Sequence, residues 1–181
     1  AQEQGFAVIE KEVNSMLHQG VNDSLDLVLQ MKQGQVNSFF KQLFNELDNI
    51  SKGKAPADVF MSMASFRSSN MLDDTTMDID NDMYTTLCEF RGKGLPEIAE
   101  KSGYANLYLI DADGFVLYAT TRGPELGRKL DSGPLADIWR QAISTRTTQL
   151  QDVALYQEEE NTPCFFIAAP VIQFESVKGV V

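Results

Sequence analysis

Three side chains that alternate along one β-rich stretch could together bind an acidic small molecule. Tyr118, Thr120 and Arg122 occupy every second position from a predicted strand into the segment that follows it. Successive side chains of a strand point to opposite faces, so we expect these three to face the same way. The guanidinium of Arg122 is a fixed bidentate donor that suits a carboxylate. The alternative is an arginine that lies in solvent without a ligand.

Five further residues are candidates for the wall of a ligand pocket. Trp139 and Tyr156 could each cover a ligand with an amphipathic ring, although ordinary core or rim aromatics would give the same pattern. Asp152 could accept a hydrogen bond from a cationic group, but a surface carboxylate is equally consistent with its position. Phe166 and Ala168 share one face of a predicted strand, where a small residue beside a large one leaves space.

The residues needed for common catalytic centres are missing from the sequence. His18 is the single histidine, so neither a histidine-based triad nor a histidine metal cluster can be assembled. Residues 91–94 (RGKG) lack the frame of a phosphate-binding loop. A carboxylate pair for acid–base chemistry stays open, because the chain has 26 acids and no feature singles out two of them. We therefore expect no enzyme activity and no cofactor.

One acidic stretch imitates a calcium loop. Asp78, Asp80, Asp82 and Glu89 match four ligand positions of such a loop, but Met83 stands where the sharp turn needs glycine. The stretch that contains Glu89 also has the pattern of a helix. We therefore expect no metal site here.

Composition indicates one ordinary globular domain with an additional long element. The 181 residues are 43% hydrophobic and 23% charged, which is the usual range for a folded chain. The net charge of −11, without a basic cluster, argues against nucleic acid as a partner. Cys88 and Cys164 are too few for a zinc site or a disulfide framework, and whether they pair stays open.

The first 52 residues predict one long amphipathic helix. Between Phe6 and Ile50 apolar residues recur at steps of three and four, and no proline interrupts them. At about 1.5 Å per residue such a helix is longer than the remaining domain is wide, so we expect part of it to project. Its apolar stripe then needs a partner, which is the same helix of a second subunit or a following helix of the chain. A helical bundle without a signalling role is the alternative. The stripe consists of Phe6, Ile9, Val13, Met16, Leu17, Val21, Leu25, Val28, Val36, Phe39, Leu43, Leu47 and Ile50.

Residues 53–103 predict a helical segment that contains an acidic loop. A break at residues 51–58 precedes a helix over 57–67, and the acidic loop follows at 72–82. Two short helices are expected at 82–90 and 95–101, the second ended by Gly103.

Residues 104–181 predict an α/β unit with the order β-β-α-β-β-β. Strands are expected at 106–110 and 115–121, joined by a hairpin whose Asp and Gly suit a tight turn. A helix over 134–144 and strands at 148–156, 164–172 and 177–181 follow, the last two joined by a turn around Glu175 and Ser176. The fold class expected is α+β, with a PAS-like, five-stranded, mostly antiparallel sheet and helices on one side.

Several ordered motifs of this unit resemble the Cache (PDC) sensor domains of bacterial chemoreceptors and sensor histidine kinases. They are GYANLYLIDADGFVLYATT, GRKLDSGPLADIWRQA, PCFFIAAPVI and KGVV, with Gly127, Leu130, Gly133 and Pro134 in the turn before the helix. The stretch VLQMKQGQVNSFFKQLFNEL is similar to the stalk helix of those receptors. The resemblance covers about three quarters of the chain.

The resemblance implies a periplasmic or other extracytoplasmic sensor domain of an inner-membrane receptor. In that family a small molecule binds in the PAS-like pocket and the long helix carries the signal. Tyr156 matches a tyrosine of those receptors, whereas Trp139-Arg140 stand in the wrong order for the amino-acid-binding signature. Flanking membrane spans are expected in the full-length protein, because the chain lacks an initiator Met and ends within a predicted strand. A non-sensing dimerisation module is the alternative function.

Overall fold

The computed structural model describes residues 2–156 and 162–181, without the side chains of residues 2–10 and 12. The chain divides into two compact units, Ala1–Leu43 and Phe44–Val181. Each unit is described here by itself. The predicted contributions of Phe6 and Ile9 to the apolar stripe fall on side chains outside the described residues.

Helix α1 (Gln2–Ser51) is one unbroken helix, as the apolar periodicity predicts. Among its described side chains the stripe is exposed from Val13 to Phe39, whereas Leu47 is buried in the core of the second unit. The break after α1 is shorter than predicted, because α2 (Lys54–Ser69) begins three residues early. Pro56 is tolerated there since it occupies the first turn, where backbone N–H groups have no partner within the helix.

Helices α3 (Asp82–Arg91) and α4 (Leu95–Ser102) confirm the two predicted short helices. The side chain of Asn81 caps α3 by accepting from the backbone N–H of Met83 at 2.9 Å. Gly103 ends α4 at φ 70°, in the left-handed region that favours glycine. The acidic loop before α3 lies along the sheet, where the N–H of Met77 donates to the carbonyl of Gly127 at 2.8 Å.

The sheet has the predicted order of strands, with one interruption. Strands β1 (Tyr108–Asp111), β2 (Val116–Ala119), β5 (Pro170–Gln173) and β6 (Ser176–Val180) pair in the order β2-β1-β6-β5, while β3 (Gln149–Tyr156) pairs with β4 (Thr162–Ala168). All these pairs are antiparallel. The strand predicted at 164–172 is divided at Ala169, which exchanges backbone hydrogen bonds of 2.8 and 2.9 Å with Val181. If β4 and β5 are counted as one interrupted strand, the described residues form the predicted five strands of an α+β fold.

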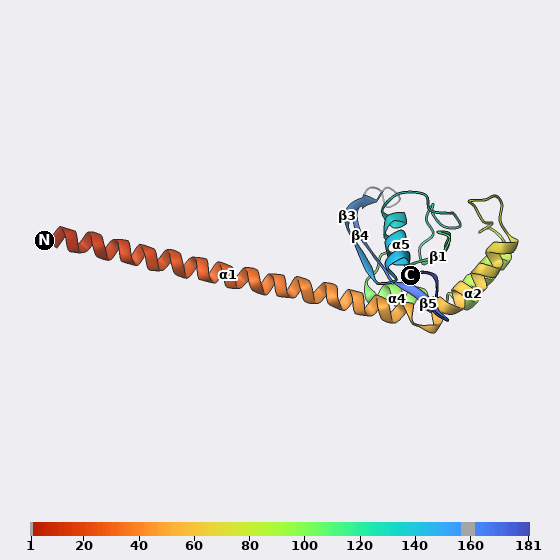
Figure 1. Cartoon of the computed structure of the whole chain (residues 1–181), viewed down its shortest axis with the longest axis horizontal. Coiled ribbons are helices and arrows are strands. Elements are labelled where there is room, and N and C mark those ends of the chain that lie inside the picture. The colour runs from red at the N-terminus through yellow and green to blue at the C-terminus, as the bar shows by residue number, and fades with distance from the viewer. Residues whose placement is uncertain (1, 157–161) are drawn as a thin grey trace. The chain divides into compact units, whose positions relative to one another are not determined.

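Helices cover both faces of the sheet, so the expectation of helices on one side is wrong. Gly179 of β6 faces α2, since a Cβ added there would lie 2.5 Å from the ring of Phe60. The next residue, Val180, faces the other way and packs in one cluster with Ile138 and Ala142 of α5 (Pro134–Thr145). Figure 1 shows α5 beside β3 and β4, in agreement with the contacts between these elements.

Candidate ligand pocket

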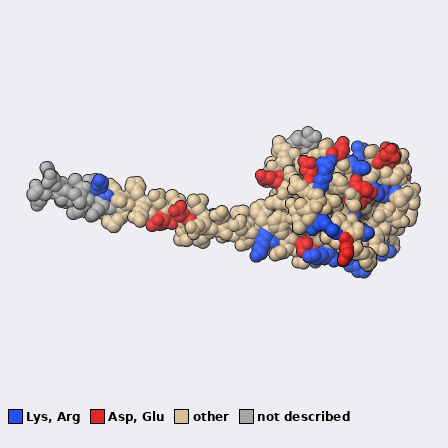
Figure 2. Space-filling view, in the orientation of Figure 1, with Lys and Arg blue, Asp and Glu red and all other residues tan. Residues whose placement is uncertain are grey.

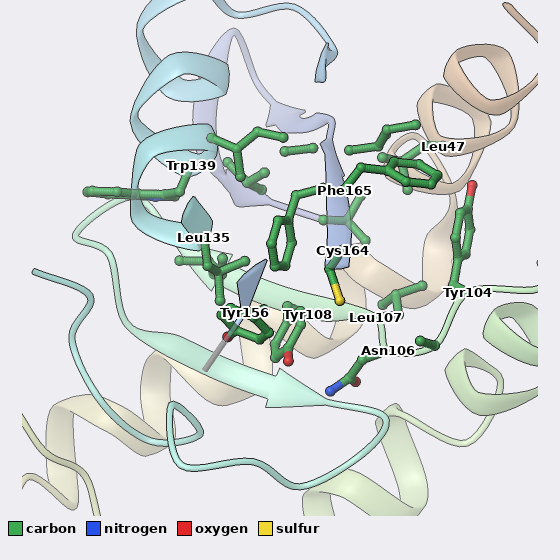
Figure 3. A pocket seen from close by; sticks show the side chains of 18 of the residues that line it. Leu47, Tyr104, Asn106, Leu107, Tyr108, Leu135, Trp139, Tyr156, Cys164 and Phe165 are labelled. Atoms are coloured by element: carbon green, nitrogen blue, oxygen red, sulfur yellow. The ribbon is translucent and has the colours of Figure 1, made fainter. Parts of the chain in front are cut away.

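A cavity of about 380 Å³ lies between α5 and the face of the sheet that α5 covers. Its wall is made by α5, by strands β1, β3, β4 and β6, by the segment that precedes β1, and by Leu47 near the end of α1. Figure 3 shows aromatic side chains entering from several of these elements. Ligand sites in proteins usually measure about 300 to 1,000 Å³ and are largely apolar, so this cavity has the size and character of one.

Strand and helix periodicity explain why these side chains meet. Tyr108 and Ile110 alternate on β1 and both line the cavity, as does Val180, the cross-strand partner of Ile110. On α5 the cavity is lined by Leu135, Ile138 and Trp139, at spacings of three and four that place them on one face of a helix.

Trp139 forms one wall of the cavity and is held by the β1–β2 hairpin. Its indole Nε1 donates to the backbone carbonyl of Asp111 at 2.9 Å. Its ring lies against Gly114, where an added Cβ would stand 3.0 Å from the ring and where φ is 92°. Glycine is therefore required at this turn, and the single donor of the indole is occupied within the protein.

Three tyrosines, Tyr104, Tyr108 and Tyr156, line the cavity, and the surroundings of two of their hydroxyl groups bear on ligand binding. The hydroxyl of Tyr156 donates to Glu125 Oε1, and its ring meets Phe166 edge to face with centroids 5.0 Å apart. The hydroxyl of Tyr104 is buried without a hydrogen-bond partner in the part of the chain that the structure describes. Burial, together with the charge of Glu46, raises the pKa of Tyr104 to about 12, so this hydroxyl is neutral at physiological pH.

Four of the eight predicted pocket residues line this cavity, and four do not. Those that line it are Trp139, Tyr156, Phe166 and Ala168, while Tyr118, Thr120, Arg122 and Asp152 lie elsewhere. Whether any of the eight binds a ligand stays a prediction. Tyr104, Tyr108, Cys164 and Phe165 also line the cavity but were not predicted from the sequence, although the alternation along β1 was a signal for Tyr108.

Tyr118 points to the opposite face of the sheet. Its cross-strand partner is Leu109, which alternates with the cavity residues Tyr108 and Ile110. The Tyr118 hydroxyl donates to the carbonyl of Gly92 at 3.5 Å, and burial raises its pKa to about 12. On that same side the guanidinium of Arg122 lies 5.9 Å from the centre of the Tyr84 ring, next to α3.

Thr120 and Asp152 make local contacts. The hydroxyl of Thr120 accepts from the N–H of Leu107 and donates to Asn106 Oδ1, both at 2.9 Å, which closes the end of the β1–β2 hairpin. Asp152 is exposed, and its Oδ1 accepts from the N–H of Val153 at 2.7 Å.

The acidic stretch shows local hydrogen bonds in place of a calcium loop. Asp78 Oδ1 accepts from the N–H of Asp80 at 3.2 Å. Within the described residues no group of three or more His, Cys, Asp or Glu side chains is placed to hold a metal ion. Cys88 and Cys164 are both free thiols, and burial raises the pKa of Cys88.

Comparison with solved structures identifies the fold of this unit. The chain is similar to the sensor domain of the histidine kinase DctB from V. cholerae, with a TM-score of 0.50 and 18% sequence identity. This likeness shows a sensor-domain fold. The match covers 86% of this chain and 54% of the DctB structure, so the chain corresponds to about half of that domain's length. No model of a known protein family and no curated protein matches the sequence. None of the helices in the described part of the chain is long and apolar enough to cross a membrane.

Proposed function

We propose that this chain is an extracytoplasmic sensor domain of a bacterial membrane receptor, and that it binds a small molecule in the cavity beneath α5. The cavity itself is the observation that carries the proposal. Protein interiors are normally close-packed, so a module that only dimerises would be expected to fill the apolar space of about 380 Å³ beside its sheet with its own side chains. The sensor-domain fold supports the same role.

The DctB neighbour supports a receptor of the sensor-kinase type. The matched protein is the sensor domain of a histidine kinase, so the ligand signal would pass to a kinase or a comparable output module. In this proposal the chain lies in the periplasm between membrane spans of the full-length protein. The helix α1 carries the signal, because it extends without a break from residue 2 into the core of the second unit, where Leu47 is buried.

Filling the cavity should abolish ligand-dependent stabilisation. Cys164 lines the cavity and is half-buried, and Figure 3 shows its sulfur among the lining side chains. A library of small metabolites is screened by thermal shift on the wild type and on Cys164→Phe. A compound at a hundredfold excess over its Kd should stabilise the wild type by about 2.7 kcal/mol and leave the filled variant unchanged.

The matched control is Val153→Phe, which adds the same ring at an exposed position of β3 that does not line the cavity. This variant should respond to the compound as the wild type does. Stabilisation that persists in Cys164→Phe would show that the compound binds elsewhere and would remove the support for this cavity as the sensing site.

We also propose that the exposed part of the α1 stripe, from Val13 to Phe39, pairs with the same stripe of a second copy. Val21, Leu25 and Val28 are each more than half exposed, which is unusual for large apolar side chains unless they have a partner. The apolar residues recur with a period of three helical turns in 11 residues, which is close to the period of a straight helix. This period is seen at positions 17, 21, 25 and 28 and again at positions 36, 39, 43, 47 and 50. Figure 2 shows few charged side chains along α1 in its view, so little charge opposes such pairing.

Placing charge on the stripe should separate the two copies. The double variant Val21→Glu, Leu25→Glu puts four carboxylates at the centre of the proposed contact, and we expect a monomer by light scattering where the wild type is a dimer. The control Gln30→Glu adds a charge on the opposite side of the helix and should remain dimeric. A wild type that is monomeric at 0.1 mM, roughly a thousandfold above a Kd of about 0.1 µM, would contradict the proposal.

A further inference from the structure

The wall of the cavity carries no charged side chain among the described residues that form it. Aromatic rings dominate it, contributed by Tyr104, Tyr108, Trp139, Tyr156, Phe165 and Phe166. Figure 3 shows the rings of Tyr104, Tyr108, Tyr156 and Phe165 among the side chains that line this space. Such a wall binds by excluding water from apolar and aromatic surface, which favours a ligand of the same character.

Most polar groups at the wall are already hydrogen-bonded within the protein. The indole of Trp139 donates to Asp111, and the hydroxyl of Tyr156 donates to Glu125. The amide of Asn106 donates to the carbonyl of Thr121 and accepts from its N–H, both at 3.0 Å. The hydroxyl of Tyr104 differs, because it is buried and has no partner in the described part of the chain. A buried hydroxyl without a partner is costly, so a ligand that supplies one hydrogen bond here would recover that cost.

Two acids, Glu46 and Glu125, lie beside the wall, and one cation, Arg140, lies 6.0 Å from the centre of the Trp139 ring, where it is paired with Asp137 at 3.1 Å. Glu46 accepts from the hydroxyl of Ser102 at 2.5 Å and raises the pKa of Tyr104 through its charge, while Glu125 holds Tyr156. Arg122, the cation expected to bind a carboxylate, lies on the opposite face of the sheet beside Tyr84. A carboxylate in the cavity would find no cation among the described residues of the wall and two acids beside it, while Arg140 is already paired with Asp137, and this disfavours an anionic ligand.

We propose that the ligand is an uncharged aromatic molecule with one hydrogen-bonding group that pairs with the hydroxyl of Tyr104. This inference rests on the proposed function and narrows it, and it replaces the carboxylate that the sequence suggested. An apolar cavity of about 150 Å³ accommodates benzene, so a space of about 380 Å³ accepts a ligand of one to three rings. Figure 3 shows the Tyr104 hydroxyl turned toward Leu47, so we expect the polar group of the ligand at that end of the cavity.

The test compares probes that share a ring system and differ in charge. N-phenyl-1-naphthylamine is neutral and fluoresces in apolar surroundings, and its sulfonated counterpart 8-anilino-1-naphthalenesulfonate is an anion. The neutral probe should bind one site per chain at least about tenfold more tightly than the anion. Indole should displace it, whereas indole-3-acetate and tryptamine should be at least about tenfold weaker competitors. Tighter competition by indole-3-acetate or by tryptamine would overturn the proposal of an uncharged ligand.

Substitutions locate the probe and test the hydrogen bond. Cys164→Phe should abolish binding of the neutral probe and Val153→Phe should not. Tyr104→Phe should weaken indole about fivefold but leave benzothiophene, which lacks the N–H, unchanged. Equal losses for both competitors would overturn the role of the Tyr104 hydroxyl.

These outcomes separate the ligand class from the proposed function. If the charged competitors bind the wild type more tightly than indole does, and do not bind Cys164→Phe, the cavity binds a small molecule of another class and the proposed function stands. If every probe binds Cys164→Phe as it binds the wild type, the cavity is not a binding site and both proposals fail. If Cys164→Phe does not fold, Ala168→Leu narrows the same cavity from β4 and serves the same test.

Discussion

Replacing Gly179 by alanine should lower the free energy of unfolding by about 3 kcal/mol. Gly179 lies in β6 between Asp111 of β1 and Val171 of β5, at the place where α2 crosses the sheet. An added Cβ would overlap the carbonyl oxygen of Ile110 and stand 2.5 Å from Cε1 of Phe60. A side chain can rotate away but a carbonyl within a paired strand cannot, so the sheet or α2 has to shift.

Chemical denaturation of the wild type and of Gly179→Ala measures this loss. Gly94→Ala is the matched control, because no atom lies within 4 Å of the Cβ it would add, and we expect a change of at most about 0.5 kcal/mol. A loss at Gly179 no larger than that of the control would mean that α2 is not packed against β6 as described. Adding Phe60→Leu to Gly179→Ala should recover part of the loss, namely the part that arises from the ring.

Local chemistry predicted most of the elements, because caps and turns act over a few residues. Gly103 sits in the left-handed conformation that ends α4, and Pro134 stands in the first turn of α5, as the sequence patterns predict. The divided strand at Ala169 was not visible, because its apolar run continues through the interruption. At Ala169 the strand changes its pairing partner, because β4 pairs with β3 and β5 pairs with β6. Pairing partners are set by distant parts of the chain, so the local sequence does not show the change.

The face on which a side chain lies was much harder to predict than the strand that carries it. All four residues of β2, Val116–Ala119, are buried, so the strand has no polar side to indicate which face meets which helix. Alternation groups Tyr118 with Arg122, and the structure places both near α3. The sequence could not show that α2 and α3 cover this face, and this is why a carboxylate site was expected on the side of the sheet opposite the cavity beneath α5.

The cavity itself depends on contacts between residues far apart in sequence. Tyr104 precedes β1, Trp139 lies on α5 and Cys164 on β4, and no local pattern links the three. Trp139 and Tyr156 were predicted because large aromatic residues are good general candidates for a pocket wall. The described residues of the wall carry no charge, which could be seen only when its members were known, and this changes the expected ligand from a carboxylate to an uncharged ring.

A chain of contacts runs from the cavity to α2 through the β1–β2 hairpin. Trp139 donates to the carbonyl of Asp111, and the carboxylate of Asp111 lies 3.2 Å from Arg67 of α2. Oδ1 of Asp111 also accepts from the N–H groups of Asp113 and Phe115, both at 2.9 Å, which fixes the turn. A ligand that moved Trp139 would therefore act on Asp111, which ties the hairpin to α2. Helix α2 itself begins three residues after the end of α1.

Replacing Arg67 by methionine should lower the free energy of unfolding by about 3 kcal/mol at pH 7, and by less at pH 5. The side chains of Arg67 and Asp111 are 22% and 8% exposed, so removing the cation leaves a buried carboxylate without its partner. Burial already raises the pKa of Asp111, and the charge of Arg67 opposes that rise, so the variant's pKa should be higher still. An acid whose pKa is raised on folding stabilises the fold at low pH and loses that contribution as pH increases, so the deficit should shrink on acidification.

Lys101→Met is the control, because its partner Glu97 is 67% exposed and the pair contributes little. Denaturation curves at both pH values measure the effect. A deficit that is equal at pH 5 and pH 7 would show that Arg67 does not act through Asp111, but through its packing on Phe115, 4.6 Å from the ring centre, or through its ion pair with the exposed Asp113.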